Sequence, residues 1–220
     1  MINYNTIAIV IGVNALVYML IHIPLDIITV IKKAQREKSG AKEYPAWEKG
    51  KNFVKIITIL ASIIFWLFFL LWPIIHFLNW DGFILFFNFE IPFVSEALQY
   101  IGLIITSFGT FIACLGRISR SIYAISWGIP NKLTTHLGFR IVRHPLYTSY
   151  ILYFLGLPLA MQNYLLIPLI LGIIGYVFSA KYEEQILLLE FGEEYKEYQR
   201  KVGMLLPFIG RRKDDLKENE

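Results

Sequence analysis

Two short clusters of polar residues carry the groups in this sequence that could do chemistry. The first is Arg143-His144-Pro145, and the second is the adjacent pair Glu183-Glu184. Together they offer hydrogen-bond donors for a carboxylate and carboxylates for an ammonium group, so a pocket built from both suits a zwitterionic ligand. An equally good alternative is structural: Arg143 extends along apolar surface to water, His144 caps a helix, and the glutamates solvate a helix end.

Long apolar segments separate the charged parts of the chain. The 220 residues are 56% hydrophobic and 17% charged, and all 21 lysines and arginines fall within 32–55, 117–143 and 181–217. Backbone groups in hydrocarbon must hydrogen-bond within their own segment, so the apolar stretches between these blocks predict helices that cross a bilayer. A single cysteine, Cys114, excludes a disulfide scaffold.

The expected fold is all-α, a polytopic membrane helix bundle with about five crossings. The last two crossings are short and form a helical hairpin over 147–180, followed by a short tail helix. Residues 1–116 hold the first three crossings, and residues 117–220 form the second region. The expected crossings are Ile7–Ile31, Ile56–Leu78, Ala97–Leu115, Tyr147–Met161 and Leu165–Ala180.

Five crossings place all three basic blocks on one face of the membrane. The opposite face carries only acidic residues, namely Asp81, Glu90 and Glu96. Basic loops favour the cytoplasmic side, which predicts a multi-pass protein of the cell membrane with its N-terminus outside and its C-terminus in the cytoplasm. The net charge of +4 is therefore explained by contact with membrane lipids and not by nucleic acid.

The first crossing contains two ionisable residues four positions apart, His22 and Asp26. Such residues inside a membrane are costly and often functional. The simpler interpretation pairs Asp26 with Lys32 or Lys33 at the interface. Residues 83–93, rich in phenylalanine, are expected to form an interfacial turn or a short amphipathic segment on the outer side.

The hairpin brings the two polar clusters together. Because the fourth and fifth crossings are antiparallel neighbours, 143–144 and 183–184 emerge side by side at the inner face. Pro145 suits the first turn of a helix, whose free N–H groups point toward the same place. Gly192 is expected to close the fifth helix, and 193–201 to form the tail helix.

One side of this tail helix carries Tyr195, Tyr198 and Val202, at spacings of three and four. A stripe of this kind usually packs against the protein. It could also lie on the membrane surface or cover the pocket.

At these motifs the sequence resembles the isoprenylcysteine carboxyl methyltransferase family, integral-membrane enzymes that use S-adenosylmethionine. The resemblance rests on Arg143–Tyr147, on Glu183-Glu184, and on the run Phe191–Tyr198 that ends near Pro207. It covers residues 114–210, nearly half of the chain.

The resemblance implies a methyltransferase whose cofactor, S-adenosylmethionine, enters from the cytoplasm and whose lipophilic acceptor enters sideways from the bilayer. Glu183 would hold the amino group of the cofactor. Arg143 and Glu184 would serve the reaction by positioning, with Arg143 orienting an acidic substrate group, and His144 or Glu184 would be the base for an amine or phenol. The implied cofactor contacts are Asn131, Lys132, Leu133, Thr134, Phe139, His144, Pro145, Leu146, Tyr147 and Glu183.

Two positions depart from the family pattern. Ser179 stands where members acting on prenylated cysteine carry an arginine, and Phe139 stands where tyrosine is usual. The first departure weakens a carboxylate acceptor more than it weakens methyl transfer, so another lipid or a small hydrophobic molecule remains open. Two other functions also remain open: an NADPH-dependent membrane reductase of the sterol type, and a non-catalytic membrane protein. The four histidines are too scattered to predict a metal site.

Overall fold

The computed structural model describes residues 2–37, 52–123 and 133–208. Within these ranges the chain is helical and contains no β-strand, apart from two isolated bridges. The elements are α1 (Tyr4–Glu37), α2 (Asn52–Trp66), the π-helical turn η1 (Leu67–Leu71), α3 (Trp72–Phe77), α4 (Gly82–Leu85), α5 (Ser95–Tyr123), α6 (Gly138–Ile141), α7 (Pro145–Met161), the 3₁₀ turn η2 (Tyr164–Leu166) and α8 (Leu169–Lys201).

The expected multi-pass helix bundle is confirmed. Four helical segments are long and apolar enough to cross a membrane: Tyr4–Ile31, Asn52–Phe77, Ser95–Arg120 and Tyr164–Lys201. The fifth expected crossing is α7, a shorter apolar helix of 17 residues. In the second segment, η1 immediately precedes Pro73, which has no N–H to continue the regular hydrogen-bond ladder.

Small residues bring α5 and α7 into close contact along their length. A Cβ on Gly156 would lie 2.4 Å from the Thr106 hydroxyl, and a Cβ on Gly102 would lie 2.3 Å from the Ala160 nitrogen. Neither position has room for a side chain, so the two backbones approach as closely as in other membrane helix pairs built on small residues. The pair α2 and α8 packs in the same way, because Gly175 faces Thr58.

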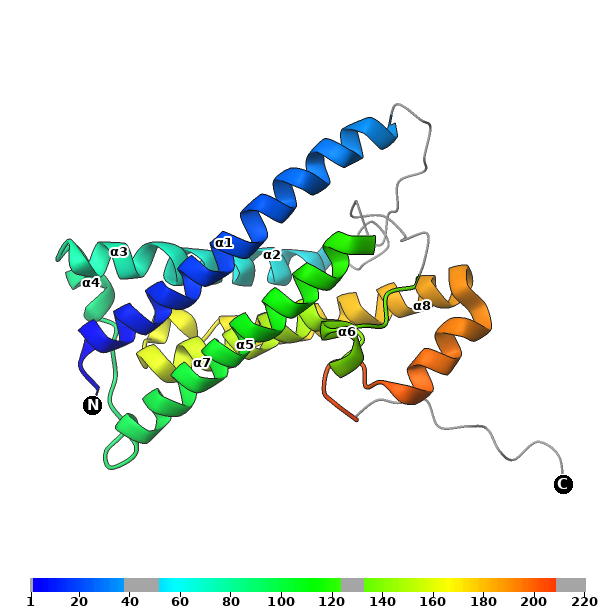
Figure 1. Cartoon of the computed structure of the whole chain (residues 1–220). Helices are drawn as coiled ribbons and strands as arrows, with labels where there is room; N and C mark the ends of the chain where they lie inside the picture. Colours follow the sequence, from blue (N-terminus) through cyan, green and yellow to red (C-terminus); the bar gives the residue numbers. More distant parts are fainter. Residues whose placement is uncertain (1, 38–51, 124–132, 209–220) are drawn as a thin grey trace, which may run out of the picture.

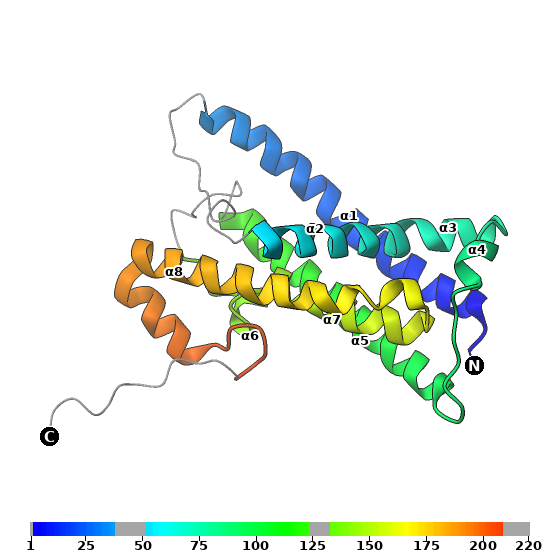
Figure 2. The same ribbon diagram turned by 180° about the vertical axis from the view of Figure 1, so that it is seen from behind.

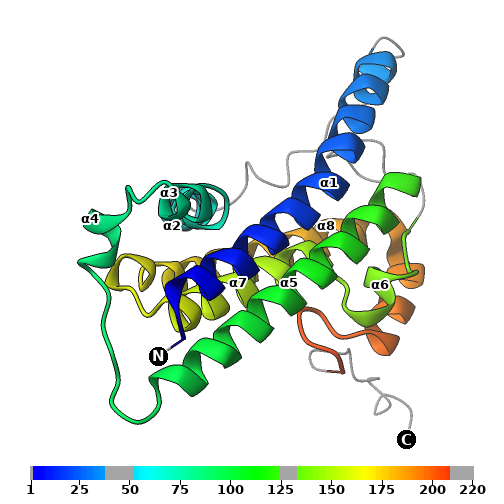
Figure 3. The ribbon, with the colours of Figure 1, turned by 60° about the vertical axis from the view of Figure 1, so that its left-hand side comes forward.

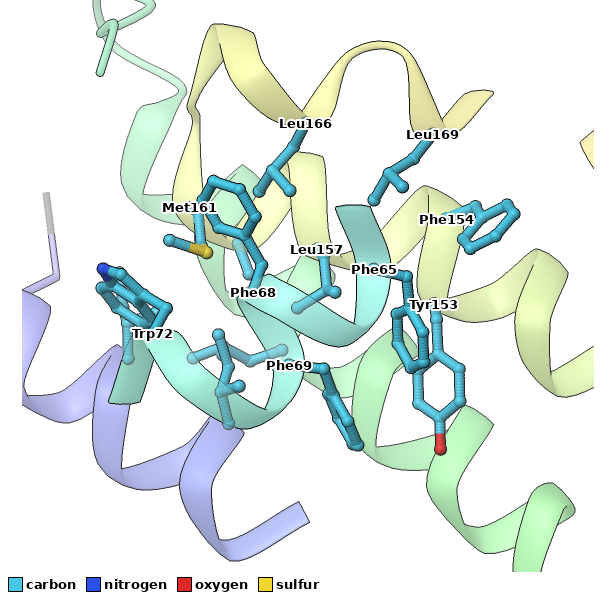
Figure 4. Close-up of a cluster of buried hydrophobic side chains, with 14 of the residues drawn as sticks. Phe65, Phe68, Phe69, Trp72, Tyr153, Phe154, Leu157, Met161, Leu166 and Leu169 are labelled. Atoms are coloured by element: carbon cyan, nitrogen blue, oxygen red, sulfur yellow. The ribbon is translucent and has the colours of Figure 1, made fainter. Parts of the chain in front are cut away.

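Aromatic rings fill the centre of the bundle (Figure 4). Phe65 and Phe69 of the second segment stack on each other at 5.0 Å, and Phe65 stacks on Tyr153 of α7 at 4.8 Å. These rings and Phe154 are fully buried. Large planar side chains at this point fix the second segment against α7, since burial and ring geometry act together.

The helix ends sort into two groups. Figures 1 and 2 show α6, the C-terminal parts of α5 and α8, and the first turns of α2 and α7 together at one end of the bundle. At the opposite end lie α3, α4 and the start of α5, as Figure 3 also shows. The described arginines and lysines belong to the first group and Asp81, Glu90 and Glu96 to the second, in agreement with the charge pattern.

Two polar residues of α1, His22 and Asp26, have partners in the described part of the bundle. Asp26 pairs with Arg117 of α5 at 2.5 Å, and Arg117 also donates to Thr29. His22 is buried and stacks on Tyr18 with ring centroids 3.6 Å apart. The bridge from Asp26 to Arg117 ties α1 to α5, and the side chains of Lys32 and Lys33, expected near Asp26, lie outside the described residues.

The outer segment agrees with the interfacial expectation. The turn α4 follows Asp81, whose buried carboxylate contacts His76 at 2.6 Å. Phe83 and Phe86 expose most of their side chains, in keeping with a segment at the lipid–water boundary.

Candidate cofactor site

The loop before α7 lies tightly against the end of α5. A Cβ on Gly138 would lie 2.8 Å from the Gly116 nitrogen, and a Cβ on Gly116 would lie 2.9 Å from the Pro145 Cβ. Ser119 accepts a hydrogen bond from the Gly138 amide at 3.3 Å. Glycine at these two positions therefore lets α6 and the first turn of α7 meet α5, which sets the position of the residues between them.

The Arg-His-Pro and Glu-Glu motifs are in contact, as the hairpin geometry predicts. Arg143 donates through Nε to Glu184 at 2.5 Å, with side-chain exposures of 2% and 13%. Arg143 also donates through Nη1 to the backbone carbonyls of Gln199 and Val202. One buried guanidinium thus joins the start of α7, the middle of α8 and the end of α8.

The segment after α8 returns to the same place and pairs with the residues before α7. The Arg143 amide donates to the Gly203 carbonyl at 2.9 Å, and the His144 amide donates to the Met204 carbonyl at 3.2 Å. Thr148 donates its hydroxyl to the Leu205 carbonyl at 2.8 Å. We call residues 202–205 the C-terminal clamp.

Gly192 allows the chain to make this return. Its φ of 51° and ψ of −122° are non-helical and open mainly to glycine, and α8 changes direction there (Figure 2). Beyond the bend, Tyr195 and Tyr198 are buried, and the Tyr198 hydroxyl donates to the Phe139 carbonyl at 2.5 Å. The expectation that the fifth helix closes at Gly192 agrees with this bend, and Tyr195 and Tyr198 lie in the wall of the cavity described next.

A cavity lies between the loop, the first turn of α7 and the bent end of α8. The space between its atoms, open solvent included, measures about 620 Å³. The lining residues are Arg120, Leu133, Thr134, Phe139, Arg143, His144, Pro145, Leu146, Tyr147, Glu183, Leu187, Tyr195 and Tyr198.

The imidazole of His144 lies between the two carboxylates. Its Nδ1 is 3.6 Å from Glu183 and its Nε2 is 3.4 Å from Glu184. Burial lowers the pKa of His144, but the two neighbouring carboxylates outweigh burial and raise the pKa above the ordinary value. His144 and Arg120 both lie near the Glu183 carboxyl group, which faces the cavity.

The cavity wall fits a ligand that carries both an ammonium group and an aromatic or cationic part. Thr134 is buried, lines the cavity, and its hydroxyl has no hydrogen-bond partner among the residues that the structure describes. An unpaired buried hydroxyl is costly unless a ligand or water completes it. Tyr147 presents an aromatic ring beside the Glu183 carboxylate, a combination suited to a sulfonium and an ammonium.

The structure brings most of the residues named from the sequence into this wall. Eight of the expected cofactor contacts line the cavity: Leu133, Thr134, Phe139, His144, Pro145, Leu146, Tyr147 and Glu183. Asn131 and Lys132 fall outside the described residues. Arg143 also lines the cavity, whereas Glu184 is joined to Arg143 and Gln199 on the side of the C-terminal clamp.

The sequence did not lead us to expect Arg120 and Leu187 in the cavity wall. Leu187 lies four residues after Glu183, so the helical repeat alone would have placed it on the same face. Arg120 carries no such signal, because its place depends on how the end of α5 packs against the loop.

Comparisons with known proteins agree with these motifs. No family model matches the chain. A methanethiol S-methyltransferase from a Pseudomonas species is 30% identical over 198 residues, which cover 82% of this chain and 71% of that relative. The chain belongs to the isoprenylcysteine carboxyl methyltransferase-like family.

Other members of the family match over shorter stretches. A probable protein-S-isoprenylcysteine O-methyltransferase from Oryza sativa is 33% identical over 119 residues, covering 51% of this chain and 62% of the relative. A methanethiol S-methyltransferase from Mycobacterium tuberculosis is 34% identical over 93 residues, covering 40% of this chain and 37% of the relative. The chain therefore spans less than two thirds of these two relatives.

Proposed function

We propose that this protein is a membrane methyltransferase that uses S-adenosylmethionine and acts on a lipophilic acceptor. The observation that carries the proposal is the cavity at the basic end of the bundle. There the Glu183 side chain, the Thr134 hydroxyl, which has no partner among the described residues, and the ring of Tyr147 face one space. When bound, S-adenosylmethionine supplies an electrophilic methyl group, which bonds to the acceptor as its bond to the sulfonium breaks, leaving a neutral thioether.

The roles of the cavity residues follow from their chemistry. Glu183 binds the ammonium group through a charge-assisted hydrogen bond, and the Thr134 hydroxyl forms a hydrogen bond with a polar group of the ligand. Tyr147 and Phe139 supply aromatic surface for the nucleoside or the positive charge. Asn131 and Lys132, which the family pattern adds to these contacts, lie outside the described residues.

Arg143 and Glu184 act by positioning. Their ion pair holds the C-terminal clamp against the start of α7, and the clamp places Tyr195 and Tyr198 in the cavity wall. His144, whose raised pKa favours the protonated form, places a positive charge between Glu183 and Glu184.

The relatives' names divide the acceptors into two kinds, an isoprenylcysteine and methanethiol. Either is apolar enough to reach the site from the bilayer. In the proposed orientation the basic end of the bundle faces the cytoplasm, the N-terminus lies outside, and the methyl donor enters from the aqueous side.

The experiment that tests this proposal measures binding of S-adenosylhomocysteine to the detergent-purified chain by titration calorimetry. Loss of one charge-assisted hydrogen bond is worth about 1.5 to 3 kcal/mol, so Glu183→Gln is expected to weaken affinity by roughly ten- to a hundredfold.

Glu190→Gln is the matched control, because Glu190 is exposed on the same helix. Its affinity should equal that of the wild type. Equal affinity for Glu183→Gln and wild type, or binding of NADPH in place of S-adenosylhomocysteine, would contradict the proposal.

A further inference from the structure

The membrane side of the cavity is closed by a stack of tyrosines. Tyr147, which lines the cavity, contacts the ring of Tyr176 with centroids 5.7 Å apart. Tyr176 stacks on Tyr150 at 4.6 Å with an interplanar angle of 7°. Tyr150 lies one turn deeper than Tyr147 on α7, and Tyr176 lies two turns deeper than Glu183 on α8, so the stack sits directly behind the cavity. We call Tyr150 and Tyr176 the tyrosine plug.

The second helical segment holds the tyrosine plug from behind. The hydroxyls of Tyr176 and Ser62 lie within hydrogen-bond distance at 2.9 Å, and Tyr176 is 8% exposed. Phe65, which is fully buried, contacts Tyr150 at 5.5 Å, and Phe154 contacts Tyr176 at 5.6 Å.

The backbones beyond these rings also leave no passage. A Cβ on Gly172 would lie 2.4 Å from both the Ala61 Cβ and the Phe154 ring. A Cβ on Gly175 would lie 1.9 Å from the Thr58 hydroxyl. The helices α2, α7 and α8 are therefore in direct contact behind the tyrosine plug, and a chain of methylenes has no space along this path.

We infer that the tyrosine plug limits the acceptor to a short apolar molecule, such as a small alkanethiol, and excludes a long isoprenyl chain. This inference rests on the proposed function. A short thiol fits the cavity in front of the tyrosine plug, beside the ring of Tyr147, where aromatic surface suits a polarisable sulfur. As its sulfur bonds to the methyl group, the thiol loses its proton to water. A long chain would have to displace two stacked rings and their buried neighbours.

The test uses the full chain in detergent and the variants Tyr150→Ala and Tyr176→Ala. Rates of labelled methyl transfer are measured for alkanethiols of increasing length and for a farnesylated cysteine. Affinities of the corresponding methyl thioethers are measured by thermal shift without the methyl donor, which reads the acceptor space independently of activity.

The wild type should prefer short acceptors, and long ones should be weaker by roughly tenfold or more, the usual cost of overpacking a filled interior. Each alanine variant should shift this limit to longer chains in both measurements. Tyr176→Phe keeps the ring and Tyr100→Ala removes an exposed tyrosine from α5, so both should keep the wild-type limit. Tyr176→Leu, with a smaller cavity than alanine, serves if alanine prevents folding, and it should shift the limit in the same direction.

Wild-type preference for the farnesylated cysteine, or an unchanged length limit in both alanine variants, would overturn the inference. Failure of the wild type to bind S-adenosylhomocysteine would instead overturn the proposed function, and the inference with it. The two failures are distinguished because cofactor binding is measured before any acceptor is added.

Discussion

Replacing Arg143 with glutamine tests whether the C-terminal clamp holds the site together. The guanidinium is 2% exposed, contacts Glu184 at 2.5 Å, and donates to the Gln199 and Val202 carbonyls. Its loss leaves a largely buried carboxylate without its main charged partner. Removing one partner of a buried pair costs about 3 to 5 kcal/mol. For a chain of this size each kcal/mol corresponds to about 2 to 4 °C, so the melting temperature should fall by roughly 6 to 20 °C.

The assay is thermal unfolding in detergent, combined with limited proteolysis of the segment after Gly192. Arg143→Lys should recover part of the loss, since lysine restores a charge but not the planar fork that reaches three acceptors. Arg140→Gln is the matched control, because Arg140 is exposed in the same loop. If Arg143→Gln had the same melting temperature and the same rate of proteolysis as Arg140→Gln, the clamp would not depend on Arg143 and the reasoning would be wrong.

Three further predictions concern the glycines and His144. Gly192→Ala should destabilise the bent end of α8 by about 1 to 3 kcal/mol, because φ is 51°, and protease should cut the tail faster than in the wild type. Gly156→Val should lower the melting temperature through contact with α5, whereas Gly82→Ala, where a Cβ meets nothing within 4 Å, should leave it unchanged. The raised pKa of His144 adds stability that is complete below about pH 6.5 and is lost as pH rises through the folded-state pKa. Between about pH 6 and pH 9 the melting temperature of the wild type should therefore fall by more than that of His144→Gln. Parallel slopes for these two proteins would contradict the assignment.

The crossings could be predicted because two strong signals coincide in the sequence. Apolar runs long enough to span hydrocarbon alternate with the three basic blocks, and both signals are set by the cost of moving polar groups into lipid. The bend at Gly192 was also predictable, since glycine closes helices that side chains would otherwise continue. The helices extend beyond the predicted crossings, for example α5 to Tyr123, because helical backbone continues into water without an apolar requirement.

The contacts between distant segments could be predicted only where both partners carry recognisable chemistry. The paired motifs 143–144 and 183–184 met that condition, and the structure places them together. The contacts of the C-terminal clamp could not be predicted in this way, because Gly203 and Met204 contribute only backbone carbonyls, which every residue has. The pairing of Asp26 with Arg117 also carried no signal in the sequence, because it depends on how α1 packs against α5.

In each two-residue motif, one residue belongs to a buried ion pair and its neighbour faces the cavity. Arg143 and Glu184 form the buried pair that joins α7, α8 and the clamp, whereas His144 and Glu183 face the cavity. His144 also contacts Glu184, so the two pairs share one electrostatic network. Loss of Arg143 should therefore reduce stability and, through the displaced wall, cofactor affinity. Loss of Glu183 should reduce affinity with little change in melting temperature. The free-energy effects of mutations at residues in contact do not simply add. A Glu183→Gln, His144→Gln double variant should therefore lose less affinity than the sum of the two single losses. Simple additivity would mean that His144 acts on the ligand independently of Glu183.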